Sequence, residues 1–239
     1  MLRRRWWLAL TVMVSTGLAF SSGTDVSFED EDGHTLEGRL YEASGRGPAI
    51  LLLDPCEPDH GSLDQLGDAL AQGGFHALRY DSGGAVTDEG GSERVSGSER
   101  AQRDRRGAAM ARAAVAFLRE QPRVDAETIG VIAAGCGSAP AMRLAMALPE
   151  VATVVFLSSS GPKTDHLTLE WFLGVKQFPQ LFVTSVDDRS YKRTFSLFRK
   201  ATSPHCRLII YKGHISGTAL FDHDPELANT IIAWMKRHL

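Results

Sequence analysis

The stretch IGVIAAGCGSAPAMRLA, residues 129–145, decides how this chain folds. Its first six residues are small or apolar, as in a buried strand, and the residues from Ser138 onward have the composition of a helix. Between them lie Gly135, Cys136 and Gly137, which are small enough for a sharp turn. We therefore predict a strand, a tight turn and a helix in immediate succession.

Short apolar runs of the same kind recur along the chain, with helical patterns between most of them. Before them, residues 26–43 alternate apolar and polar side chains around Asp32-Gly33, which predicts an antiparallel hairpin. The alternation of strands with helices predicts an α/β fold with a mainly parallel sheet. The expected strands are residues 49–54, 76–81, 128–134, 152–158, 181–186 and 207–212, and the expected helices are residues 62–72, 98–120, 138–148, 190–202 and 225–238.

The N-terminal residues 1–23 predict export. They place three arginines before a run of about fifteen uncharged, mostly apolar residues, and the small polar run SSGT follows. This pattern is typical of a secretory signal peptide, cleaved between Ala19 and Thr24, and it predicts a periplasmic or extracellular protein. An uncleaved segment would instead anchor the chain to a membrane. The length of 239 residues and the hydrophobic content of 43% fit one domain over residues 24–239.

The charge and the cysteine content of the chain indicate which classes of binding partner and of fold are unfavoured. Without residues 1–23 the chain carries 23 Lys and Arg residues against 29 Asp and Glu residues, a net charge of −6 with neutral histidines. Such a surface does not favour nucleic acid or anionic lipid as a partner, and a membrane contact is expected only through an uncleaved N-terminus. Three cysteines are too few for a disulfide scaffold. The Gly-, Ser- and acid-rich residues 81–99 are expected to form a surface loop.

Five stretches carry a resemblance to a known family: PAILLLD, GFHALRYD, VDAETIGVIAAGCGSAPAMRLA, VTSVDDRSY and the C-terminal run that starts YKGHISGT. In this order they resemble the α/β-hydrolase fold over essentially the whole mature chain, and most closely the small dienelactone-hydrolase-like esterases and peptidases. The resemblance implies a mostly parallel central sheet with an N-terminal antiparallel hairpin and helices on both faces. It also implies where a catalytic triad would lie.

The resemblance implies that two of the three triad members are missing. In the family, Gly-x-Ser-x-Gly presents the nucleophile on a strained turn, and the matching residues 133–137 place Gly135 at the serine position. The acid position falls on Asp188, with Asp187 beside it. The histidine position falls on Ser216, and a serine hydroxyl cannot act as a base near neutral pH. We therefore expect a non-catalytic protein that binds a small ester-like ligand or a protein partner, without a cofactor or a metal.

The oxyanion side of the site departs from the family pattern as well. The family's His-Gly after the third strand is replaced by Asp54-Pro55, and proline has no backbone N–H group. The resemblance then assigns the two oxyanion N–H groups to Cys56 and Cys136. Two residues that converge on one oxygen can lie close enough for a disulfide, which would seal the pocket and leave Cys206 unpaired, although two separate free thiols are the alternative.

An alternative triad shifts two members along the chain. Cys136 would be the nucleophile, His214 the base and Asp188 the acid of a thiol hydrolase that acts on small esters or lactones. Against it, a shift of one residue at the start of a helix rotates a side chain by about 100°. A third interpretation places the nucleophile at Ser138, the nearest other hydroxyl.

Three remaining segments have a structural and a functional interpretation each. Residues 221–224 carry potential metal ligands, but a helix-start cap before Pro225 is the favoured role. Residues 158–161 could line a pocket or simply end a strand. Trp171, Phe172 and Phe178 could line a ligand cleft, although packing in the core is favoured.

Overall fold

A computed structural model describes residues 23–53, 61–81, 97–159, 173–174 and 176–239. An eight-stranded sheet runs through the molecule in the order β1-β2-β4-β3-β5-β6-β7-β8. The first two pairs, β1 with β2 and β2 with β4, are antiparallel, and every later pair is parallel. The strands are β1 (Thr24–Glu29), β2 (Thr35–Tyr41), β3 (Gly47–Leu53), β4 (His76–Tyr80), β5 (Val124–Ala134), β6 (Val151–Leu157), β7 (Gln180–Ser185) and β8 (Arg207–Tyr211).

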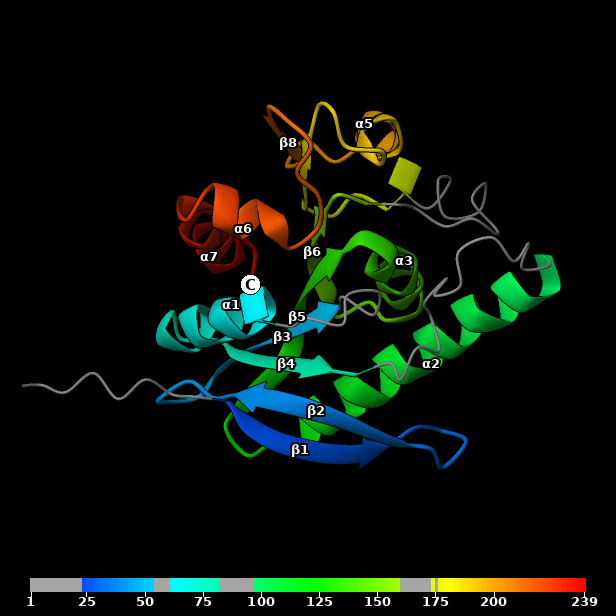
Figure 1. Cartoon of the computed structure of the whole chain (residues 1–239). Coiled ribbons are helices and arrows are strands. Elements are labelled where there is room, and N and C mark those ends of the chain that lie inside the picture. The colour runs from blue at the N-terminus through cyan, green and yellow to red at the C-terminus, as the bar shows by residue number, and fades with distance from the viewer. Residues whose placement is uncertain (1–22, 54–60, 82–96, 160–172, 175) are drawn as a thin grey trace, which may run out of the picture.

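Helices cover both faces of this sheet (Figure 1). One face carries α1 (Gly61–Gln72), α6 (Ala219–His223) and α7 (Glu226–His238). The opposite face carries α2 (Gly97–Glu120), α3 (Ser138–Ala147) and α5 (Tyr191–Lys200). The predicted fold class is therefore confirmed: a mostly parallel sheet that begins with an antiparallel hairpin and lies between two helix layers.

The central strands are apolar on both faces because both faces are covered. Along β3, Ile50 packs under α1 and α7, while the next residue, Leu51, packs toward α2 and α3. The same alternation occurs in β5, where Val131 and Ile132 belong to the two different clusters. This explains why these strands read in the sequence as continuous apolar runs rather than as alternating ones.

The element boundaries agree with the predicted ones to within a few residues. The largest difference is at β5, which begins at Val124 rather than at residue 128. The pairing of β3 with β5 shifts register between Pro48 and Ala49, so Gly47 and Pro48 pair with residues that the apolar pattern does not reveal. The five-residue helix α6 was not predicted, because one turn is too short for a periodic pattern.

A polar cluster joins α1 to the antiparallel end of the sheet. The Tyr41 hydroxyl and the Arg79 side chain both donate hydrogen bonds to the carboxylate of Asp64, the latter over 2.8 Å. Burial, followed by the hydrogen bond to Asp64, raises the pKa of Tyr41. Asp68 lies one turn further along the same helix, and its Oδ1 is buried without a hydrogen-bond partner in the part of the chain that the structure describes.

The N-terminal prediction concerns residues outside the described part of the chain. Residues 1–22, which hold nearly all of the expected signal peptide, are not described. Over the described ranges, the helices are too short or too polar to span a membrane. Export and the membrane anchor therefore stay predictions.

Candidate functional site

The turn after β5 has the conformation expected of a nucleophile position, but it carries a glycine. β5 ends at Ala134, a short 3-10 turn covers Gly135–Gly137, and α3 starts at Ser138. Gly135 has a φ of 48°, in the left-handed region that disfavours side chains. A Cβ built on Gly135 would meet no described atom within 4 Å. The position therefore has the strained backbone and the space for a reactive side chain, and it has no side chain.

Gly137 shows the opposite environment two residues later. A Cβ there would lie 2.4 Å from the carbonyl oxygen of Leu53 in β3, closer than real Cβ atoms approach. Strand and helix thus crowd together at this point, as they do around the second glycine of a nucleophile turn. Both glycines fit the register in which the family serine position falls on Gly135.

The structure describes two of the three cysteines, one in a disulfide and one free. Cys136 is disulfide-bonded, and Cys206 is a free, partly buried thiol. Burial raises the pKa of the Cys206 thiol, which keeps it protonated at neutral pH. The remaining cysteine, Cys56, lies outside the described residues, as do Asp54 and Pro55. A bonded sulfur has no thiolate, so Cys136 cannot attack a substrate in this state.

The Asp188 carboxylate accepts hydrogen bonds from a residue of its own loop. The donors are the backbone N–H of Ser190, over 3.0 Å, and the Ser190 hydroxyl, over 2.5 Å. His214 and Ser216 lie in the loop after β8, and both are exposed. Within the described residues, no hydrogen bond or ion pair joins His214 to Asp188. The described contacts therefore show no direct bond between the acid and the base of the shifted triad, which stays a prediction.

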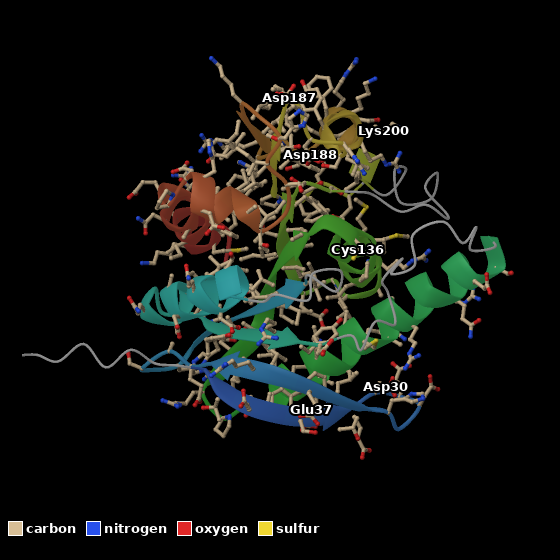
Figure 2. The ribbon with its side chains drawn as sticks, in the orientation of Figure 1. Asp30, Glu37, Cys136, Asp187, Asp188 and Lys200 are labelled. Carbon is tan, nitrogen blue, oxygen red and sulfur yellow. The ribbon has the colours of Figure 1, made fainter. Side chains whose placement is uncertain are left out.

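The loops after β7 and β8 are nonetheless held side by side. The Ser185 hydroxyl donates a hydrogen bond of 2.7 Å to the carbonyl of Ile215 and accepts one of 3.1 Å from its N–H. The N–H of Asp187 also donates to the carbonyl of Gly213 over 3.3 Å. Figure 2 shows Asp187 and Asp188 at this end of the sheet, and Cys136 at the start of α3. The loop that carries Asp188 and the loop that carries His214 and Ser216 thus lie at one corner of the molecule.

Buried hydroxyl groups without partners lie at the ends of the neighbouring strands. Ser158, just after β6, has a φ of 50°, which is unusual for a residue other than glycine. The hydroxyls of Ser158, Ser159 and Thr184 are buried and find no hydrogen-bond partner among described atoms. Residues 158–161 were singled out from the sequence, whereas nothing distinguishes Thr184 from an ordinary strand residue. Unsatisfied buried hydroxyls of this kind are the groups that a bound ligand or water would complete.

The structure also bears on the hypotheses about Ser138 and about the aromatic residues 171, 172 and 178. Ser138 is fully buried, and its hydroxyl donates a hydrogen bond of 2.9 Å to the carbonyl of Gly135, so it faces into the turn rather than toward substrate. Phe178 is 5% exposed and packs in the core, as favoured from the sequence. Trp171 and Phe172 lie outside the described residues.

Of the potential metal ligands in residues 221–224, Asp224 is engaged in hydrogen bonds within the protein. The carboxylate of Asp224 accepts hydrogen bonds from the N–H of Glu226 over 3.0 Å and from the Tyr211 hydroxyl over 2.6 Å, which fits the favoured role at the start of α7. In the hairpin turn between β1 and β2, the side chains of Asp30, Asp32 and His34 could surround an ion. Asp30 Oδ1, however, already accepts the N–H groups of Asp32 and His34, which makes it part of the turn.

A cavity of about 450 Å³ lies between the start of α1 and the helices that follow the histidine loop. Its volume is in the range of small-molecule sites, which is about 300–1,000 Å³. Both apolar and polar residues line it. The lining residues are Ser62, Gln65, Leu66, Phe221, Asp222, Pro225 and Ala228.

Comparison with known proteins places the fold but not the activity. No protein-family profile and no curated protein sequence matches this chain. Solved structures match over most of their length. An esterase from Pyrococcus furiosus superimposes with a TM-score of 0.67 at 14% identity, covering 90% of this chain and 92% of that one.

Two further structures agree. The esterase domain of a Rhodothermus marinus protein has a TM-score of 0.68 at 18% identity, covering 90% of this chain and 98% of that one. The α/β hydrolase GrgF from a Penicillium species has a TM-score of 0.68 at 19% identity, with the same two coverages. At such identities the likeness shows the fold alone, and this chain has the α/β-hydrolase fold.

Proposed function

We propose that this protein is a non-catalytic binding protein built on the α/β-hydrolase fold. The observation that carries the proposal is Gly135, which has the left-handed backbone and open space of a nucleophile position without a side chain to react. The order of the motifs further suggests the dienelactone-hydrolase-like branch. Without a nucleophile the covalent route is closed, and only weak catalysis by residual binding groups would persist.

The rest of the site supports binding without turnover. A hydrolase needs a base within hydrogen-bond reach of its nucleophile and an acid that orients the base. Here the acid position, Asp188, bonds to Ser190, and the histidine position is Ser216. The cavity beside Phe221 offers apolar and polar contacts for a small ester-like ligand, and it lies apart from the unpartnered hydroxyls of Ser158 and Thr184.

The sequence alternative, a thiol hydrolase of small esters or lactones, depends on a free Cys136. We propose that its disulfide partner is Cys56, since Cys206 is free and the sequence has three cysteines. A thiol activity would then appear only after reduction. Export to an oxidising compartment, which the N-terminal sequence suggests, would keep the bond formed.

Hydrolysis of p-nitrophenyl acetate by the purified mature chain tests the proposal. We expect the protein to hydrolyse the ester no faster than the buffer blank, both with and without dithiothreitol. We also expect no labelling of the protein by a fluorophosphonate probe. Turnover that appears with dithiothreitol and disappears in Cys136→Ala would establish the thiol hydrolase instead. Turnover that disappears in Ser138→Ala would show that the nucleophile position is assigned wrongly.

Binding needs its own measurement, because an inactive protein need not bind anything. Short-chain esters and lactones should raise the melting temperature of the mature chain. Phe221→Ala should reduce the shift, because it removes the largest apolar surface from the cavity. Phe195→Ala, in a groove on α5, is the control and should leave the shift unchanged. Equal shifts in all three proteins would place the ligand elsewhere.

A further inference from the structure

One segment of the chain is basic, although the net charge of the chain is negative. Residues 189–221, RSYKRTFSLFRKATSPHCRLIIYKGHISGTALF, contain seven Lys or Arg residues and no Asp or Glu. This segment covers α5, β8 and the loop after β8. In Figure 2, Lys200 on α5 lies at the end of the molecule opposite the β1–β2 hairpin, which carries Asp30 and Glu37. Asp187 and Asp188 lie at the same end of the molecule, directly before this segment, so the positive charge is a local cluster.

Helix α5 concentrates part of this charge on one face. Lys192, Phe195, Ser196 and Arg199 follow the spacing i, i+3, i+4 and i+7, which places them on one side of a helix. The opposite side carries Thr194 and Leu197, which are buried against the sheet. The basic face is therefore the outer face of α5, and it cannot turn inward without exposing the apolar side.

This outer face is hollowed. A groove of about 330 Å³ is lined by Lys192, Phe195, Ser196, Arg199 and Lys200. The ring of Phe195 stacks on Tyr191, with a centroid distance of 6.0 Å and an interplanar angle of 18°. Neither Lys192 nor Arg199 forms an ion pair with any residue that the structure describes.

We propose that this groove, which we call the α5 groove, binds a phosphate-bearing ligand. Lys192 and Arg199 carry like charges on one small groove, and charges on one groove are not fully screened at physiological salt, where the Debye length is about 8 Å. An anion with two charges relieves more of this repulsion than a single carboxylate can. Arg199 contributes the planar fork that suits phosphate oxygens, and Lys192 contributes a compact charge.

The aromatic pair adds a preference for the group that carries the phosphate. The half-buried Phe195 ring lines the groove beside the cations, and Tyr191 supports it from the preceding turn. A planar or apolar group attached to the phosphate would cover this ring and leave water. The Ser196 hydroxyl provides one further hydrogen-bond donor. The α5 groove therefore fits a phosphate monoester better than inorganic phosphate.

Phenyl phosphate is the matched probe, because it joins a dianion to a ring. Isothermal titration calorimetry on the mature chain should show saturable binding that weakens as salt is added. The double variant Lys192→Gln/Arg199→Gln should bind at least about tenfold more weakly, because it loses two charge-assisted contacts. Phthalate, a dianion of similar size with two carboxylates, should bind more weakly than phenyl phosphate.

The control variant Lys236→Gln/Arg237→Gln makes the same change of net charge at the end of α7 and should bind like the wild type. All four side chains are exposed, so both variants should keep their melting temperatures. A second arm uses vesicles of phosphatidic acid, whose headgroup is a phosphate monoester, in phosphatidylcholine. Binding to the vesicles alone, lost in the groove variant, would identify a lipid headgroup as the phosphate source.

Three results would overturn the proposal. Failure of both phenyl phosphate and the vesicles to bind would show that the α5 groove recognises no phosphate. Equal weakening in the groove variant and in the α7 variant would reduce the effect to net charge. Phthalate binding as tight as phenyl phosphate binding would mean a general anion site. None of these results depends on whether the site at Gly135 is catalytic.

Discussion

Gly137 lies against the carbonyl oxygen of Leu53 so closely that a single methyl group would occupy the same space. A Cβ on Gly137 would be 2.4 Å from that oxygen and 2.9 Å from the carbonyl carbon. The contact joins the turn after β5 to the end of the neighbouring strand β3, and both partners are backbone or fixed to it. The turn therefore cannot relax by rotating a side chain.

This contact predicts a large effect for Gly137→Ala. The methyl group would have to separate β3 from the start of α3, and overpacking of this kind costs about 1–3 kcal/mol, with more where backbone must move. The free energy of unfolding, measured by urea titration, should fall by at least about 2 kcal/mol. Gly45→Ala is the control, because a Cβ there meets no described atom within 4 Å. Equal stability of the two variants would contradict the close approach.

The three cysteines should react differently. Without reductant, one iodoacetamide group should enter the chain, at Cys206, and peptide mapping should recover Cys56 linked to Cys136. Burial raises the pKa of Cys206, so its alkylation should be slow at neutral pH and faster at higher pH. With reductant, three groups should enter. Alkylation of Cys136 without reductant would contradict the bond.

Breaking the disulfide should also lower stability. Cys136→Ser should reduce the free energy of unfolding by about 2–4 kcal/mol, the usual contribution of a native disulfide. Cys206→Ser removes a thiol that has no such bond and should have a smaller effect. A smaller loss for Cys136→Ser than for Cys206→Ser would argue against a structural role for the bond.

The fold was predictable because its signals are local and repeated. Continuous apolar runs mark strands buried on both faces, and β3, β5, β6 and β7 are strands of this kind. The sharp turn at Gly135 was predictable for a similar reason, since small residues between a strand and a helix leave few conformations. The bulge between Pro48 and Ala49 and the short helix α6 carry no periodic signal, and they were missed.

The site was predictable only in part, because it depends on which side chains meet. The sequence could place Asp188 after β7 and His214 after β8, but not tell whether they touch. Ser190, two residues from Asp188, donates hydrogen bonds to both carboxylate oxygens of Asp188, so a histidine would have to compete with Ser190 for them. In the same way, the sequence spacing of Lys192 and Arg199 does not reveal that they line a groove.

Asp68 should make stability depend on pH. Burial, and then the charge of Asp64, raises the pKa of Asp68 above its usual value of 3.8, so the folded state favours the protonated form. The folded chain then binds more protons than the unfolded chain, and stability falls as pH rises from about 4 through the raised pKa. Asp68→Asn should remove this loss and stabilise the protein at pH 8, with little effect below pH 4.

Melting temperatures at several pH values would measure this effect. Glu127→Gln makes the same change of charge at an exposed position and should leave the pH profile unchanged. A lower stability of Asp68→Asn at pH 8 would contradict the prediction. It would mean that the ionised carboxylate of Asp68 makes a stabilising contact in the folded state.

The proposal that Gly135 stands at the nucleophile position can be tested by adding a side chain there. Gly135→Ser adds a hydroxyl where a Cβ meets no described atom within 4 Å, and the left-handed backbone should cost about 1–3 kcal/mol of stability. The serine alone should not hydrolyse p-nitrophenyl acetate, because in our proposal the base position falls on Ser216. Adding Ser216→His supplies a base, and general base catalysis contributes about 100-fold or more to a rate.

The double variant should therefore exceed Gly135→Ser by at least about tenfold, less than the full effect, because Asp188 still bonds to Ser190. Ser190→Ala frees one carboxylate oxygen and should raise the rate of the double variant further, without activating the single one. Gly135→Ser with His214 intact distinguishes the shifted base. If that single variant were already as fast as the double one, His214 would be the working histidine, and the assignment of the base position to Ser216 would be wrong.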